Sequence, residues 1–157
     1  MSREVRIGII GLGTGKENAK AFHRNKRGCV TALCDLNQEL MVSFSKELSA
    51  TERFKHFTDY KALCRSKEID AVFIGTPNQF HAQMAIEAIR NGKHVMITKP
   101  LADSLNAARG FVEAIESERL VGMMSLEFRF SPECQYLLRQ AETGIFGDVY
   151  YGRASSF

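Results

Sequence analysis

The sequence predicts an α/β fold built on a doubly wound parallel sheet. Short apolar runs alternate with longer segments of helical periodicity along most of the 157 residues. A glycine cluster, Gly11-Leu12-Gly13-Thr14-Gly15, lies between the first apolar run and the first helical segment. An acidic residue, Asp35, ends the second apolar run. Strands that alternate with crossover helices form parallel sheets covered on both faces, and this length suits one such domain.

The first half of the chain contains three alternations of strand and helix. Residues 5–10 are apolar apart from Arg6 and Gly8, which is typical of a strand covered on both faces. Asp59 is placed to cap a short helix. We expect strands over 5–10, 29–34 and 54–57, and helices over 16–25, 37–48 and 59–65.

The second half continues the same pattern. Residues 69–74 are rich in β-branched and aromatic side chains, which favours a buried strand. Ser104 is placed to cap a helix, and Pro132 stands just inside the start of another. We expect strands over 69–74, 94–98, 121–126 and 149–157, and helices over 79–90, 104–118 and 132–143.

The charge and cysteine content exclude several classes of protein. Lys and Arg number 21 against 18 Asp and Glu, so the net charge of +3 predicts neither a nucleic-acid nor a membrane surface. No apolar stretch approaches the ~18 residues of a membrane span. Cys29, Cys34, Cys64 and Cys134 form no CxxC pair. We therefore expect reduced cysteines, no metal site and a cytoplasmic protein.

The glycine cluster suits a turn that approaches a phosphate. Glycines let the backbone come close to a pyrophosphate, and the helix that follows offers N–H donors. The usual GxGxxG spacing would put the third glycine at Lys16, whereas it occurs one residue early, at Gly15. A P-loop would need glycine at Ile10 and Ser or Thr at Glu17, so that reading fails. A tight turn without a ligand is the alternative.

Asp35 indicates which dinucleotide would bind. A carboxylate at the end of the second strand can accept hydrogen bonds from the adenine-ribose diol and would repel a 2′-phosphate. Leu36 and Asn37 supply no cation, so NAD is favoured over NADP, although Lys16 could reverse the preference. The alternative for Asp35 is a plain helix cap.

Two further motifs follow predicted strands, where ligands bind in open α/β sheets. One is Thr76-Pro77-Asn78, with His81 soon after it, and the other is Lys99-Pro100. Lys99 could reach a substrate or the nicotinamide, although a single lysine is more often a solvated surface group. His81 could bind a ligand, cap a helix or pack in the core.

Together these motifs resemble the Gfo/Idh/MocA family of oxidoreductases. The resemblance covers the glycine turn, Asp35, the segments around Thr76 and Lys99, and two later motifs at 128–132 and 144–149. It implies transfer of hydride between NAD(P) and a hydroxyl or ketone of a small sugar, cyclitol or polyol. The implied catalytic residue is Lys99, although the Glu that precedes this lysine in the family is Thr98 here. The cofactor-binding residues would be Gly11, Leu12, Gly13, Thr14, Gly15, Asp35, Leu36, Thr76, Pro77, Asn78, His81, Lys99, Pro100 and Arg129.

The resemblance also predicts the domain organisation. Residues 1–147 would form the dinucleotide-binding domain, and residues 148–157 would begin a second α/β domain that supplies the acid/base histidine. We therefore expect this chain alone to be inactive and the full-length protein to form a homo-oligomer. The alternative is a non-catalytic module of the same fold that senses NAD(P) or acts as a scaffold.

Overall fold

The computed structural model describes residues 4–49, 51 and 53–155. Within them, six strands form one sheet in the order β3-β2-β1-β4-β5-β6, and every neighbouring pair is parallel. The strands are β1 (Val5–Ile10), β2 (Gly28–Cys34), β3 (Lys55–Phe57), β4 (Ala71–Ile74), β5 (His94–Thr98) and β6 (Gly122–Ser125). The predicted doubly wound parallel sheet is therefore confirmed.

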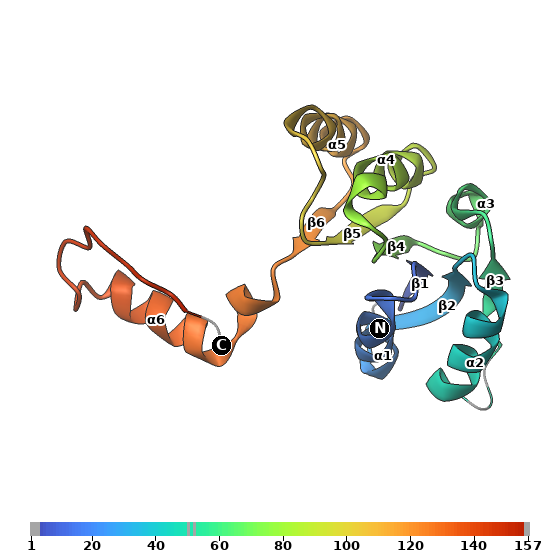
Figure 1. Ribbon diagram of the computed structural model, residues 1–157, viewed down its shortest axis with the longest axis horizontal. Helices are drawn as coiled ribbons and strands as arrows, with labels where there is room; N and C mark the ends of the chain where they lie inside the picture. The colour runs from blue at the N-terminus through green and yellow to red at the C-terminus, as the bar shows by residue number, and fades with distance from the viewer. Residues whose placement is uncertain (1–3, 50, 52, 156–157) are drawn as a thin grey trace. The chain divides into compact units, whose positions relative to one another are not determined.

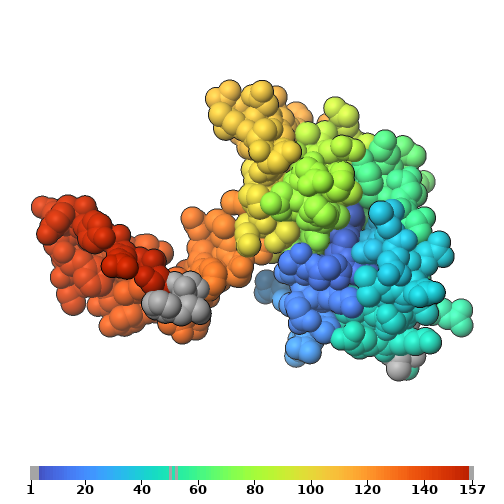
Figure 2. Space-filling view, viewed as in Figure 1, coloured from blue at the N-terminus to red at the C-terminus, as the bar shows by residue number. Residues whose placement is uncertain are grey.

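Helices cover both faces of this sheet, with α1 and α2 on one side and α3, α4 and α5 on the other (Figure 1). Phe44 of α2 and Phe73 of β4 belong to the first buried cluster, and Phe111 of α5 belongs to the second. Figure 2 shows α5, in yellow, beside α4, in light green. The helices are α1 (Gly15–Arg24), α2 (Gln38–Leu48), α3 (Tyr60–Arg65), α4 (His81–Arg90), α5 (Leu105–Glu118) and α6 (Pro132–Glu142).

Side-chain caps begin four of these helices, and the caps at Asp59 and Ser104 are those predicted from the sequence. The Asn37, Asp59, Ser104 and Ser131 side chains each accept a hydrogen bond from a backbone N–H of the first turn. The helix predicted over 79–90 differs, because a 3-10 turn at Asn78–Phe80 precedes α4 and the α-helix begins at His81. Short 3-10 turns are frequent at the N-termini of α-helices.

Polar contacts tie the sheet together at the amino ends of its strands. The Arg6 guanidinium donates to both carboxylate oxygens of Asp70, at 2.9 and 2.7 Å. The Lys93 ammonium donates to the backbone carbonyls of Ser66 and Ile69. Burial lowers the pKa of Lys93, and nearby Asp70 partly opposes that shift. These contacts hold β1, β4 and β5 in register, so that their carboxyl ends meet at one edge.

Contacts divide the chain into two units, Met1–Ser125 and Leu126–Phe157. The second unit contains a 3-10 turn at Glu127–Phe130 and helix α6. The strand predicted over 149–157 is wrong for residues 149–155, which adopt no regular structure, and its last two residues lie outside the described part. A strand needs a partner to receive its N–H and C=O groups, and these residues have none there. The domain boundary after residue 147 stays a prediction.

Candidate dinucleotide site

A pocket of about 680 Å³ opens at the carboxyl ends of the central strands. The strand order reverses between β1 and β4, and the pocket lies at this switch point, where open α/β sheets bind ligands. Residues from β1 and the glycine turn, the end of β2, the loop after β3 and the loop after β4 line it. Of the residues predicted from sequence, seven line this pocket: Gly11, Gly13, Thr14, Asp35, Leu36, Thr76 and Pro77.

Packing requires glycine at both ends of the turn. Gly11 has a φ of +85°, and a Cβ there would lie 2.8 Å from the Thr76 side chain and 2.9 Å from the Gly75 backbone. At Gly15, a Cβ would lie 2.9 Å from the Ile9 side chain. The turn therefore lies directly against the end of β4, and these two glycines serve the fold whether or not a ligand binds.

Gly13 has no such structural reason. No atom lies within 4 Å of a Cβ built on Gly13, and its φ is not in the left-handed region. Gly13 nevertheless lines the pocket, close to the N-terminus of α1, where first-turn N–H groups have no partner within the helix. The space beside Gly13 is therefore an open cradle at the pocket, with room for a pyrophosphate.

Asp35 joins the end of β2 to the glycine turn. Its Oδ2 accepts the Leu12 N–H at 2.8 Å, and its Oδ1 accepts the Asn37 N–H at 2.9 Å. Each carboxylate oxygen has two lone pairs, so one on each oxygen is left for a ribose diol. The Leu12 side chain is fully buried in the core, so Leu12 contributes to the site only through its backbone.

Lys16 is turned away from this pocket. Its ammonium lies 5.6 Å from the centre of the Phe44 ring on α2. Its charge also helps to lower the pKa of Glu47, after the larger effect of the hydrogen bond from Lys20. Among the described pocket-lining residues there is no Lys or Arg. The cation that could have favoured a 2′-phosphate is therefore directed elsewhere.

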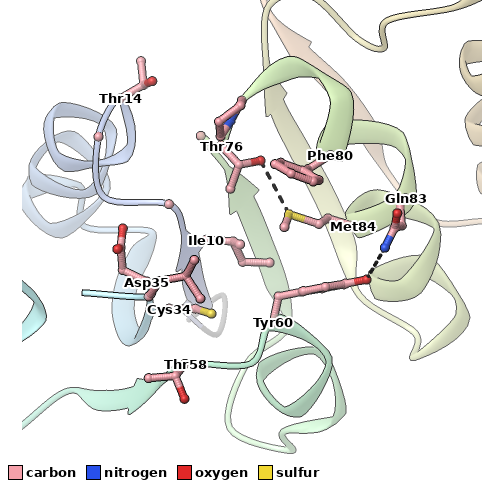
Figure 3. Close-up of a pocket in the computed structure, with 15 residues that line it drawn as sticks. Ile10, Thr14, Cys34, Asp35, Thr58, Tyr60, Thr76, Phe80, Gln83 and Met84 are labelled. Atoms are coloured by element: carbon pink, nitrogen blue, oxygen red, sulfur yellow. Dashed lines mark hydrogen bonds between the residues drawn. The ribbon is translucent and has the colours of Figure 1, made fainter. Parts of the chain in front are cut away.

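Side chains from α3 and α4, which the sequence analysis did not identify, form the opposite wall (Figure 3). Tyr60 lies across the pocket and its hydroxyl accepts a hydrogen bond from the Gln83 amide at 2.8 Å. The Thr76 hydroxyl donates to the sulfur of Met84 at 3.5 Å. Phe80 completes this wall. The sequence signal for these residues is the spacing of 80, 83 and 84, which places them on one face of the helical segment after the Thr76-Pro77 loop.

The floor beneath Asp35 is apolar. Ile10 and Cys34 line it, and burial raises the pKa of the Cys34 thiol to about 12, so this sulfur is uncharged at neutral pH. All four cysteines are thiols, as expected from the sequence. An apolar floor and wall beside one carboxylate suit a flat heterocycle attached to a diol.

The remaining predicted residues do not line the described pocket. Lys99 and Pro100 are exposed after β5, and the peptide bond between them is cis. Asn78 is exposed in the 3-10 turn. His81 is fully buried. Arg129 belongs to the second unit. Their roles in binding or catalysis stay predictions.

The described residues yield two further findings. No group of three or more His, Cys, Asp or Glu side chains among them is placed to hold a metal ion. No helix within the same residues has the length and apolar character needed to cross a membrane.

The switch-point pocket, the glycine turn and the acceptor carboxylate define a dinucleotide-binding Rossmann domain. Comparison with known families agrees: residues 5–125 match the model for the oxidoreductase family with an NAD-binding Rossmann fold. The chain belongs to this Gfo/Idh/MocA family and represents its NAD-binding domain. The resemblance found in the sequence is thereby confirmed.

Individual relatives are between a quarter and a third identical to this chain over the aligned residues. A glycosyl hydrolase family 109 protein of Streptomyces niveus is 32% identical and covers 94% of the chain. The scyllo-inositol dehydrogenase of Lactobacillus casei, solved with NAD(H) and scyllo-inositol, superposes with a TM-score of 0.87 over 93% of the chain at 28% identity. The WlbA dehydrogenase of Bordetella pertussis, solved with NADH and UDP-GlcNAcA, gives a TM-score of 0.82 over 94% at 25% identity.

These relatives are much longer than the chain. It spans 31% of the Streptomyces protein, 43% of the inositol dehydrogenase and 45% of WlbA. What those proteins bind and catalyse is therefore a property of the larger molecules.

Proposed function

We propose that this chain is the NAD-holding part of an enzyme that moves hydride between nicotinamide and a hydroxyl or ketone of a sugar, cyclitol or related polyol. The family and the structural likeness to an inositol dehydrogenase and a nucleotide-sugar dehydrogenase support this proposal. When bound, NAD supplies the hydride acceptor. The backbone around Gly13 and Thr14 would hold its pyrophosphate, and Lys99 would help to orient the substrate or the nicotinamide.

The observation that carries the preference for NAD is the environment of Asp35. Its carboxylate has a lone pair left on each oxygen, and the pocket lining described here supplies no cation to neutralise a 2′-phosphate. A ribose diol would donate two hydrogen bonds to this carboxylate, whereas a phosphate would meet its negative charge.

Comparing NADH and NADPH binding tests this preference. Asp35→Asn removes the charge and keeps an amide oxygen to accept the Leu12 N–H. We expect NADH affinity to fall about tenfold, the effect of losing one good charge-assisted hydrogen bond, and discrimination against NADPH to fall with it. Glu17→Gln is the matched control, because Glu17 is an exposed carboxylate of α1 paired with Lys20. Failure of the unmodified chain to bind NADH at millimolar concentration would refute the proposal.

A second candidate function is cleavage of a glycosidic bond with NAD. The observation that favours it is the name of the Streptomyces relative and of several Bacteroides and Shewanella relatives, which are glycosyl hydrolase family 109 proteins. Some glycosidases depend on NAD rather than on a pair of carboxylates. In the full-length protein, a dehydrogenase would accumulate NADH with a polyol. A glycosidase would release its leaving group without net change in NADH.

The substrate part of the enzyme is proposed to follow residue 147, with residues 148–157 as its beginning. The greater length of the relatives supports this division. We also propose that the complete protein is a homo-oligomer. A non-catalytic NAD-sensing module remains the alternative, and it predicts that the full-length protein binds NADH and turns over neither polyols nor glycosides.

A further inference from the structure

Among the described residues, His81 is a buried polar side chain with an exposed fraction of 0%. It begins α4, directly after the 3-10 turn that follows the pocket loop. Its Nε2 lies 2.8 Å from the Thr76 carbonyl oxygen, and its Nδ1 lies 2.7 Å from the Pro100 carbonyl oxygen. A single ring thus bridges two backbone segments that are 24 residues apart in sequence.

The two carbonyls belong to different parts of the site. Thr76 lines the pocket after β4, and its hydroxyl contacts Met84 on the opposite wall. Pro100 immediately follows Lys99, which is exposed at the end of β5. Because β4 and β5 are neighbouring parallel strands, their carboxyl ends lie side by side, and the ring fills the gap between the loops that leave them.

Both partners of the ring are acceptors. A neutral imidazole carries one N–H, so it can donate to one carbonyl while its other nitrogen presents a lone pair to the second. A ring with hydrogen on both nitrogens donates to both carbonyls. At a fully buried position, each satisfied acceptor avoids the cost of an unpaired polar group.

We infer that His81 is a positioning residue whose ring bridges the two carbonyls and so holds the Lys99 loop in a fixed relation to the Thr76 wall of the cofactor pocket. The ring does not line the described pocket, because it is buried behind the loops it joins. This inference rests on the proposed function for the meaning of Lys99 and of the pocket. The bridge itself rests only on the geometry of His81.

Two conservative variants each keep one contact. Asparagine places its amide nitrogen near the position of Nδ1, so His81→Asn keeps the Pro100 contact and loses the Thr76 contact. Glutamine reaches the position of Nε2, so His81→Gln keeps the Thr76 contact and loses the Pro100 contact. Hydrogen exchange of the backbone amides in 75–78 and 99–102 reports on the two loops separately. Each variant should speed exchange in the loop it releases and leave the other unchanged.

The affinities for ADP-ribose and NADH also test the bridge. ADP-ribose lacks the nicotinamide, so it probes the pocket without the Lys99 end. We expect His81→Asn to weaken ADP-ribose and NADH alike, by about fivefold to tenfold, the equivalent of one hydrogen bond. We expect His81→Gln to weaken NADH and leave ADP-ribose unchanged. Equal effects of both variants on both ligands would overturn the inference, as would no effect of either.

An NMR measurement on the unmodified chain tests the bridge even if the variants do not fold. In ¹⁵N-labelled protein, a slowly exchanging ring proton on His81 supports the bridge, and the absence of any such proton overturns it. This readout and the exchange experiment need no ligand. If neither NADH nor ADP-ribose binds the unmodified chain, the proposed function fails, and the bridge is then decided by ring protons and hydrogen exchange alone.

Discussion

At the scale of single residues, the glycines of the turn differ in their roles: Gly11 is needed for packing, whereas Gly13 is proposed to make room for the cofactor. Gly13 faces open space within the pocket. Gly13→Ala should leave the free energy of unfolding within about 0.5 kcal/mol, as for a surface substitution. It should weaken NADH binding at least about tenfold, because the methyl group would occupy the place of the pyrophosphate. Urea unfolding and NADH titration of the same protein check both parts.

The control for this prediction is Gly11→Ala. At Gly11 the positive φ and the contact with Gly75 oppose any side chain, so this variant should lose about 1–3 kcal/mol of stability without ligand. If Gly13→Ala unfolds as easily as Gly11→Ala, the cradle at Gly13 is structural and the assignment of the phosphate position is wrong.

The buried thiols give a prediction about pH. Burial raises the pKa of Cys34 and of Cys64 to about 12, above the ~8.5 of an exposed thiol. A group whose folded pKa is raised contributes stability below its unfolded pKa and loses that stability as pH rises toward the folded value. The free energy of unfolding should therefore fall between about pH 8.5 and 12, by up to ~1.4 kcal/mol per pH unit for each thiol.

Urea unfolding at pH 8 and pH 10 measures this loss. The double variant Cys34→Ala, Cys64→Ala should be less stable at pH 8, because it leaves cavities, but should lose less stability between the two pH values. An equal loss in both proteins would show that other groups cause the alkaline sensitivity.

At the scale of elements, two glycines at the contact between α5 and its neighbours should respond in opposite directions. A Cβ on Gly122 of β6 would lie 2.8 Å from the Phe111 ring, whereas one on Gly110 of α5 would lie 3.6 Å from the nearest atom of Ile86. Gly122→Ala should cost about 1–3 kcal/mol through overpacking. Gly110→Ala should gain about 0.5–1 kcal/mol through helix propensity. The difference in denaturation midpoint between these variants checks the packing of α5.

The elements also show how far the sequence alone leads. Residue pattern predicts the central strands because buried parallel strands are largely apolar runs, and predicted side-chain caps mark helix starts at Asp59 and Ser104. The strand predicted over 149–157 fails over residues 149–155 because its pattern gives no information about a pairing partner. Tyr60 and Gln83 escape prediction for a similar reason, since only the packing of α3 against α4 brings them to one wall.

At the scale of the whole molecule, the described pocket accounts for binding better than for catalysis. Its titratable lining side chains are Asp35, Cys34 and Tyr60. Asp35 already accepts two backbone hydrogen bonds, and the Cys34 thiol stays protonated at neutral pH. Neither of these two is suited to accept a proton from a substrate hydroxyl, and the Tyr60 hydroxyl already accepts a hydrogen bond from Gln83. A proton acceptor and the groups that orient the substrate would have to come from elsewhere in the enzyme.

The chain by itself should therefore bind NADH and catalyse nothing. A positioned acid or base contributes roughly 10²–10⁴-fold to the rate, and orientation of the substrate contributes more. NADH at 100 times its dissociation constant should stabilise the chain by about 2.7 kcal/mol, visible as a rise in the thermal unfolding midpoint. Incubation with NAD and inositols or sugars should produce no NADH above background. Turnover of any of them by the chain would show that residues 1–157 already contain a complete active site, and would overturn the proposed division of roles.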